Sequence, residues 1–528
     1  MTIARILAGL LTLTCAAAAT AQDAARPATQ PATPKYNVLF IISDDLRAEL
    51  GSYGGLAKTP NLDALANKGV KFERAYCQYP LCNPSRTSML TGTYPTQSGV
   101  IGNRDDWRAT HPDWVTLPRL FKDNGIPSLR TGKIFHGIDW LDDPKAWTEG
   151  GTFKPVTATS QAAAVARDRR GGEGEVDPDA RPRRNAATRL TPATNPAGPV
   201  DHNSREYLLA GSAPVPGQPA QQARSDHWGA TDDGPDGGTA GSTHQAIDYL
   251  NRYKDQQFFL AVGYSKPHSP LDTSLRFFQE YDFNQIPLPV DYQTKPTLPA
   301  GFPQGAIRPN NADLFVGKRE STPESARDMI RAYLACISSV DFNVGKVLAE
   351  VDRLGLADKT IVVFWGDHGY QLGEKGKWSK AGSVWEQGAR VPTFIYAPGL
   401  PGMGKSSPRV VESVDFYRTL ADLTGLKVDD HVDGRSLVPL LKNPTAEWNH
   451  PAYTVWSEDG RTLTAISVRN ERYRYAEFTA GAGGAMLLDE VNDPHELKNV
   501  VDDPAHAAVR AELAKLVADY RARFKPTE

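Results

Sequence analysis

Three segments of this chain are continuously apolar rather than alternating, and polar residues follow each of them. They are residues 36–45, 257–264 and 360–365. Such runs are typical of strands that are buried on both faces of a parallel sheet. Helical stretches accompany them in the sequence at residues 61–68, 243–253 and 326–353. Strands that alternate with helices predict a doubly wound α/β sheet.

The residues that follow these strands are suited to chemistry. They are acids, histidines and a lysine: Asp44 and Asp45, then Lys266 and His268, then Asp367 and His368. Ligands bind beyond the carboxyl ends of the strands in doubly wound sheets, so we expect these side chains to converge. Carboxylates are hard oxygen ligands, and such ligands select Ca²⁺ or Mg²⁺.

The start of the chain has the pattern of a secretory signal peptide. An apolar run over residues 6–19 leads into Ala19-Thr20-Ala21, which offers the small residues that a signal peptidase reads. We predict a signal peptide over residues 1–21 and a flexible leader over 22–35, and hence a periplasmic or secreted protein. A membrane anchor is the alternative, but the run is too short to span, so no stable membrane insertion is expected.

The remaining chain divides by composition. We predict a catalytic domain over residues 36–430, interrupted at about 157–241 by a segment rich in Ala, Arg, Pro, Gly and Gln. We interpret that segment as a partly disordered insertion, either a dispensable surface loop or a lid that faces the substrate. A small α+β subdomain is predicted over residues 431–528. Its elements are two short strands and a helix, at 462–469, 472–478 and about 504–523.

Composition narrows the class of protein. The 528 residues are 40% hydrophobic and 23% charged, with a formal net charge of −3. These values fit a globular protein and exclude collagen-like, wholly disordered, disulfide-scaffold and polytopic membrane classes. The near-neutral balance also provides no electrostatic footprint for nucleic acid. Of four cysteines, Cys15 lies in the predicted signal peptide, which leaves an odd number for an oxidising compartment.

The most specific motif is Cys82-Asn83-Pro84-Ser85-Arg86, which continues through Thr91-Gly92. Pro84 suits the first turn of a helix and Gly92 suits its end. Cys82 then stands at the helix N-terminus, where the helix dipole favours an anion. A catalytic nucleophile and a buried or disulfide-bonded cysteine both remain open on this pattern alone.

This motif resembles the signature of the type I sulfatases, and the chain is most similar to their iduronate-2-sulfatase branch. The similarity extends from the Asp44-Asp45 strand to residues 488–494. It is carried by the stretches 132–136, 263–268, 331–341 and 367–374. The resemblance implies an alkaline-phosphatase-like sulfatase fold, in which helices flank a large mixed central sheet.

The resemblance also implies two cofactors. A dedicated formylglycine-generating enzyme would oxidise Cys82 to Cα-formylglycine. One Ca²⁺ per subunit would lie beside residue 82. Its protein ligands would be Asp44, Asp45, Asp367 and His368, together with the converted Cys82, and the histidine is the least usual calcium ligand among them.

Further roles follow from the same resemblance. Arg86 would steady the alkoxide at residue 82, and Lys133 would bind the negative group there. His268 would act as the general acid toward the leaving alcohol, and Lys380 would grip the sulfate. His136 would take the proton of the second hydroxyl of hydrated formylglycine, which expels sulfate.

Two aromatic residues and one lysine complete the expectations for the site. Tyr370 and Trp378 could pack against a sugar ring or belong to the core, since aromatic residues near the end of a sheet are as often core. Tyr370 is added to Lys133, His268 and Lys380 as a predicted substrate-binding residue. Lys375 stands where many relatives carry histidine.

The predicted function is hydrolysis of an O-sulfated saccharide, a uronate 2-sulfate by branch similarity. Two alternatives stay open: a phosphate or phosphonate ester hydrolase of the same superfamily, and an inactive relative that binds sugar. Conversion of Cys82 would leave an even pair, Cys77 and Cys336, whose pairing the sequence leaves open.

Overall fold

The computed structural model describes residues 36–137, 139–155, 200–212, 227–232, 234, 239–307 and 321–523. They belong to one compact unit, Lys35–Glu528. The predicted signal peptide, the leader and most of the insertion lie outside the described residues. Among the described helices, none combines the length and the apolar character that a membrane crossing requires.

A mixed sheet of seven strands forms the centre, in the order β3-β5-β1-β7-β8-β2-β9. The predicted strands are confirmed as the adjacent β5, β1 and β7, which pair in parallel. β8 runs antiparallel to both β7 and β2. The bounds are β1 Asn37–Asp44, β2 Val70–Tyr76, β3 Ser128–Gly132, β5 Phe259–Pro267, β7 Thr360–Gly366, β8 Thr393–Tyr396 and β9 Lys405–Glu412.

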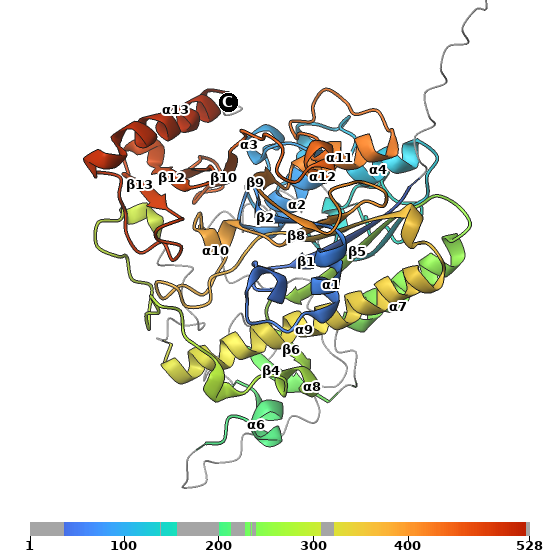
Figure 1. Cartoon of the computed structure of the whole chain (residues 1–528), viewed down its shortest axis with the longest axis horizontal. Coiled ribbons are helices and arrows are strands. Elements are labelled where there is room, and N and C mark those ends of the chain that lie inside the picture. Colours follow the sequence, from blue (N-terminus) through green and yellow to red (C-terminus); the bar gives the residue numbers. More distant parts are fainter. Residues whose placement is uncertain are drawn as a thin grey trace, which may run out of the picture. The chain divides into compact units, whose positions relative to one another are not determined.

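Helices cover both faces of this sheet, because alternate residues of β1 enter two separate hydrophobic cores. Leu39 and Ile41 pack in the core that contains α1 Pro60–Lys68, α7 Ala240–Tyr253 and α9 Pro323–Arg353. Phe40 and Ile42 pack in the opposite core. That core contains α2 Cys82–Thr91, α4 Leu117–Asp123, α11 Asp415–Thr424 and α12 Val438–Lys442. The three predicted helices are confirmed as α1, α7 and α9, and α7 and α9 lie side by side (Figure 1).

The smaller elements lie around these layers. They are α3 Pro95–Ser98, α6 Arg205–Ala210, α8 Leu275–Phe278, α10 Glu386–Ala389, β4 Trp228–Thr231 and β6 Leu271–Ser274. The elements α6 and β4 fall inside the predicted insertion. Leu208 and Trp228 from them are buried in the core beside α9, and β4 pairs with β6. This part of the insertion is therefore built into the fold rather than lying on the surface.

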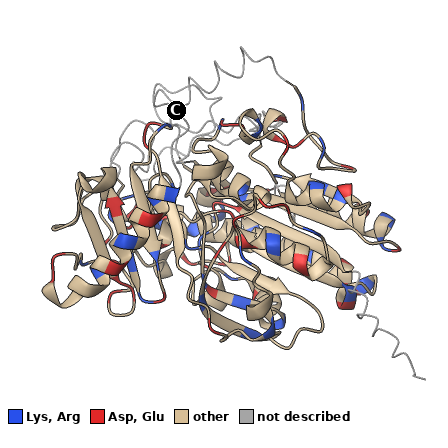
Figure 2. Ribbon diagram, turned by 90° about the horizontal axis from the view of Figure 1, so that it is seen from above, with Lys and Arg blue, Asp and Glu red and all other residues tan. Residues whose placement is uncertain are grey.

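A second, antiparallel sheet follows near the C-terminus, in the order β10-β11-β12-β13. Its strands are β10 Ala452–Trp456, β11 Ala465–Arg469, β12 Tyr473–Phe478 and β13 Ala485–Asp489, and helix α13 Ala507–Arg523 packs on β11 and β12. The two predicted strands and the terminal helix are thereby confirmed. The domain boundary at residue 431 stays a prediction. Basic and acidic residues are interspersed over both parts of the ribbon (Figure 2), in line with the near-neutral net charge of −3.

A buried carboxyl group links the two sheets at the end of β9. Glu412 accepts hydrogen bonds from the backbone N–H of Tyr453 on β10 (2.8 Å) and from the Tyr94 hydroxyl (2.6 Å). Burial and the neighbouring Asp415 raise the pKa of Glu412 to about 8. The folded chain therefore holds this proton near neutral pH, whereas the unfolded chain releases it near pH 4.5.

We predict that the Glu412→Gln variant becomes more stable relative to the parent as the pH rises. A folded pKa above the unfolded pKa stabilises the parent fully below the unfolded value, and this contribution is lost as the pH rises towards about 8. One proton limits the slope to about 1.4 kcal/mol per pH unit. Urea unfolding across this range measures the difference.

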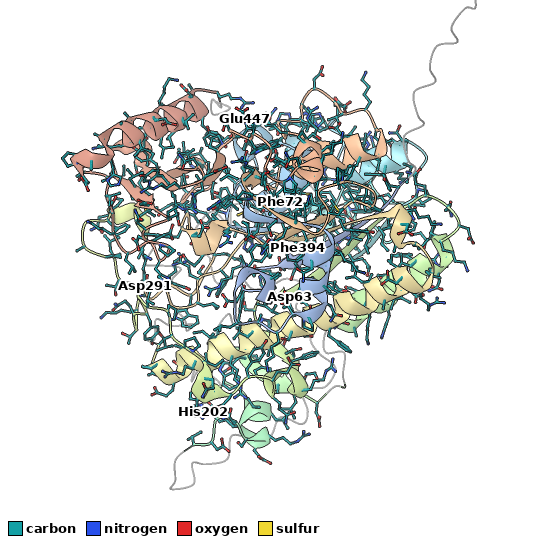
Figure 3. All side chains as sticks on the ribbon, in the orientation of Figure 1. Asp63, Phe72, His202, Asp291, Phe394 and Glu447 are labelled. Carbon is teal, nitrogen blue, oxygen red and sulfur yellow. The ribbon has the colours of Figure 1, made fainter. Side chains whose placement is uncertain are left out.

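The matched control is Glu447→Gln, at an exposed glutamate (Figure 3). Its stability should follow the parent at every pH. A constant difference between Glu412→Gln and the parent would contradict the prediction.

Candidate active site

Helix α2 carries the cysteine motif and is buried on every side. A helix with this many hydroxyl residues can be buried because its hydroxyls find acceptors: Ser85 donates to the carbonyl of Asp367, and Thr91 donates to the carbonyl of Thr87. Cys82 is its first residue, as predicted. The helix ends at Gly92, whose left-handed φ of 69° admits glycine most readily.

Arg86 lies one turn after Cys82 and is fully buried. Its Nε donates to Asp367 Oδ2 and one Nη to Asp44 Oδ1, each at 2.8 Å. Its other Nη donates to the carbonyls of Lys133 (2.6 Å) and Ile134 (3.0 Å). One guanidinium thus joins α2 to the ends of β1 and β7 and to the loop after β3.

Asp44 is held as a carboxylate by this arrangement. Its second oxygen accepts from Lys133 Nζ at 2.7 Å. Burial alone would raise the pKa of Asp44, but the charges of Lys133 and Arg86 outweigh burial and hold the pKa well below its usual value.

Asp45 brings the remaining predicted residues together around Cys82. Lys380 Nζ lies 2.9 and 3.1 Å from the two carboxylate oxygens of Asp45 and 3.6 Å from Cys82 Sγ. His368 Nε2 lies 3.3 Å from Asp45 Oδ1 and also 3.3 Å from Cys82 Sγ. The backbone N–H groups of Asp45 and His368 both donate to Asp367 Oδ1 at 2.9 Å. The carboxylates at the ends of β1 and β7 therefore gather close to the sulfur atom.

His268 approaches the same cluster from the end of β5. A ligand atom of His268 groups with those of Asp44, Asp45 and Cys82, all within 4.8 Å of one another. Its Nδ1 lies 2.6 Å from the carbonyl oxygen of Ser269, a distance that favours a proton on Nδ1. Nε2 is then the nitrogen available to other groups.

The loop that carries Lys133 and His136 passes very close to β5, and a glycine on each segment makes room for the contact. A Cβ on Gly263 of β5 would lie 2.0 Å from the carbonyl oxygen of Lys133, and one on Gly132 would lie 1.9 Å from the carbonyl oxygen of Gly263. Only glycine allows this approach. His136 follows on the same loop and is 6% exposed.

The donor set at this point fits a divalent cation. Two groups of possible ligand atoms share Asp44 and Cys82, and the atoms of each group lie within 4.8 Å of one another. The first group also contains Asp367 and His368, and the second also contains Asp45 and His268. His368 Nδ1 lies 2.9 Å from the carbonyl oxygen of Gly369, an interaction that leaves the lone pair of Nε2 facing the carboxylates. A hydrogen bond from the far ring nitrogen to a carbonyl orients the histidine ligands of metal ions in this way.

The structure places three further side chains of this region. Trp378 is 4% exposed and belongs to the core, the second of the two alternatives that the sequence left open for it. Tyr370 is partly buried, with its hydroxyl on the carbonyl of Trp378 and its ring against Tyr333. The Nζ of Lys375 pairs with the carboxylate of Asp291 at 2.7 Å, and Asp291 is labelled in Figure 3.

Two contacts of the site were missed from sequence. Lys266 pairs with Asp272 at 2.7 Å and so closes the loop that carries His268. The Ser43 hydroxyl donates to the carbonyl of Lys266. The repeated polar character of strand ends was the only sequence feature that pointed to Lys266, and nothing marked Asp272.

The cysteine pairing that the sequence left open is also settled. Cys77 and Cys336 both carry thiols and are buried. They lie in the two hydrophobic cores on opposite faces of the sheet, so they do not pair with each other.

Comparisons with known proteins agree with this geometry. A family model described as Sulfatase matches residues 36–426, and one described as N-sulphoglucosamine sulphohydrolase, C-terminal, matches 373–523. A sulfatase of Formosa agariphila is 30% identical over 488 residues, covering 89% of this chain and 84% of that protein. The iduronate 2-sulfatase of Mus musculus is 30% identical over 569 residues, covering 90% of this chain and 93% of that protein. A phosphonate monoester hydrolase structure from Silicibacter pomeroyi is similar in fold, with a TM-score of 0.65 at 23% identity, covering 93% of this chain and 96% of that one.

We predict that Arg86→Gln lowers the free energy of unfolding by about 3–5 kcal/mol, because it leaves buried carboxylates without their partner. Denaturant unfolding measures the loss. Arg252→Gln is the control, since Arg252 pairs with Glu149 on the surface and should change stability far less. Similar losses of unfolding free energy in both variants would contradict the prediction, because the buried guanidinium would then contribute no more to stability than an exposed one.

Proposed function

This chain belongs to the sulfatase family and hydrolyses sulfuric esters, and from that premise we propose that its substrate is a saccharide carrying a uronate 2-sulfate. We also propose that it acts in the periplasm or after secretion, as the signal-peptide pattern indicates. The observation that carries the proposal is the convergence of buried acids and cations on Cys82.

The charges of this cluster suit an anionic substrate. Carboxylates and permanent cations are equal in number: Asp44, Asp45 and Asp367 against Arg86, Lys133 and Lys380. A divalent cation added to this balanced set leaves two positive charges. These match one sulfate ester and one ionised nucleophile.

The cation that we propose is Ca²⁺, with one ion per subunit. Asp44, Asp45, Asp367 and Nε2 of His368 would hold it beside residue 82. When bound, it supplies Lewis-acid polarisation of a sulfate oxygen. A set of mainly carboxylate oxygens favours calcium over softer metals.

Residue 82 is proposed to be formylglycine, made by a formylglycine-generating enzyme. Its hydrate supplies one hydroxyl for attack on sulfur and a second whose deprotonation releases sulfate. The position at a helix N-terminus, with Lys380 at 3.6 Å, favours negative charge on this residue.

The other residues bind the sulfate and move protons. Lys133 pairs with Asp44 and Lys380 with Asp45, and both lysines would bind sulfate oxygens by charge. His268 would act as the general acid in its imidazolium form: Nδ1–H donates to the carbonyl of Ser269, and Nε2–H gives its proton to the leaving alcohol. His136, on the loop that Arg86 holds, is proposed to accept the second hydroxyl proton.

The choice of sugar rests on the similarity to the mouse iduronate 2-sulfatase, which extends over 90% of this chain. We predict the highest kcat/KM for saccharides with a 2-sulfated uronate, a lower value for 6-sulfated glucosamine, and faster cleavage of aryl sulfate than of aryl phosphate or phosphonate esters. Steady-state kinetics on purified protein from the native host measures all of these. A higher kcat/KM for the glucosamine ester would contradict the proposed uronate substrate. Faster cleavage of the phosphate or phosphonate esters would contradict sulfate-ester hydrolysis as the main reaction.

The same sample tests the modification. Trypsin releases residues 75–86, which contain both Cys77 and Cys82. After denaturing alkylation, the converted peptide should carry one alkyl group, on Cys77, and an aldehyde at residue 82. Cys77 serves as the internal control, and a peptide with two alkyl groups would refute the formylglycine nucleophile.

We predict that His268→Ala lowers kcat on a sugar sulfate by about 10²–10⁴-fold but has a much smaller effect on an aryl sulfate. A phenolate leaves without a proton, whereas a sugar alkoxide needs the general acid. His450→Ala, at an exposed histidine of the C-terminal part, should leave both rates unchanged. Equal losses on both esters would exclude the general-acid role of His268.

A further inference from the structure

Asp45 has a backbone conformation that is unusual for its residue type. Its φ is 59°, in the left-handed region that residues with a side chain seldom occupy. Conformations of this kind persist only where the surroundings hold them, and they concentrate at functional sites. The conformation follows directly on Asp44, so it determines where the second carboxylate of the pair points.

The hydroxyl of Tyr333 lies at the centre of this turn. It donates to the carbonyl of Asp45 at 2.6 Å and accepts from the backbone N–H of Arg47 at 3.1 Å. Tyr333 comes from the middle of α9 and is 1% exposed. One side chain therefore satisfies two backbone groups of the turn, where no strand or helix partner is available.

The rest of α9 holds the chain that follows. Ser338 donates to the carbonyl of Lys58 at 2.9 Å, and Tyr281 contacts both Ser338 and the N–H of Lys58. Asp341 accepts from the N–H of Leu62 at the start of α1 at 2.7 Å. Residues 331–341 resemble the sulfatases, although none of the proposed catalytic residues lies among them. The contacts above show that this stretch of α9 holds the segment that follows β1.

We propose that Tyr333 is a positioning residue for the cation site: its hydroxyl holds the left-handed turn that directs the Asp45 carboxylate toward His368 and residue 82. This inference rests on the proposed function, since it concerns the affinity for the proposed Ca²⁺. Tyr333 acts on Asp45 through its backbone, because the tyrosine hydroxyl donates to the carbonyl of Asp45.

The test compares Tyr333→Phe with Tyr281→Phe in the full-length protein. Both changes remove one buried hydroxyl that bridges α9 to the same segment, but only Tyr333 reaches a proposed ligand of the cation. We expect the dissociation constant for Ca²⁺, measured by calorimetry after chelation, to rise about tenfold in Tyr333→Phe and to stay unchanged in Tyr281→Phe. Urea midpoints without Ca²⁺ should fall similarly in both variants.

Hydrogen exchange provides a second readout that does not depend on the ion. The amide of Arg47 should exchange faster in Tyr333→Phe than in the parent or in Tyr281→Phe, because its acceptor is gone. Parental Ca²⁺ affinity in Tyr333→Phe, or an equal loss in both variants, would overturn the inference while leaving the proposed cation standing. A parent protein that binds no Ca²⁺ would overturn the proposed cation, and the inference with it.

Discussion

The charge of Arg86 is the constraint on which the arrangement of the site depends. Its guanidinium is buried completely, and a charge in that position is stable only if carboxylates and carbonyls surround it. Asp44 and Asp367 come from two neighbouring parallel strands, and the carbonyls of Lys133 and Ile134 come from a third chain segment. None of these segments can shift without leaving the guanidinium short of a partner.

The same constraint explains why so many ionisable groups share one small, buried volume. The carboxylate of Asp367 has both oxygens occupied, one by Arg86 and the other by the backbone N–H groups of Asp45 and His368. Groups held in this way need little rearrangement when charge develops nearby, which is the condition for electrostatic catalysis. The stability of the cluster and its suitability for sulfate hydrolysis thus have one physical origin.

Much of this arrangement could be predicted from the sequence because it depends on local patterns. The buried strands β1, β5 and β7 are continuous apolar runs, and the groups at their ends have to meet if the strands are parallel neighbours. The start of α2 at Cys82 was marked by Pro84 and its end by Gly92. The convergence of Lys380 with Asp45 came only with the resemblance, since 335 positions separate them.

Other features could not be predicted, because they depend on what approaches from far along the chain. β8 is a strand of four residues whose identity comes from its antiparallel neighbours. Trp378 looked available to a sugar ring, but the hydrophobic effect buries it in the core. Lys375 directly follows the stretch 367–374, which resembles the sulfatases, but its side chain pairs with Asp291. No spacing in the sequence indicated this contact.

The burial of Cys82 sets an order of events in the making of this protein. Every residue from Cys82 to Thr91 is buried, so the folded chain presents none of the motif to another protein. If residue 82 is converted as proposed, the modifying enzyme would need access to it before α2 is enclosed between the sheet and the helices around it. The proposed conversion would then have to precede the completion of folding.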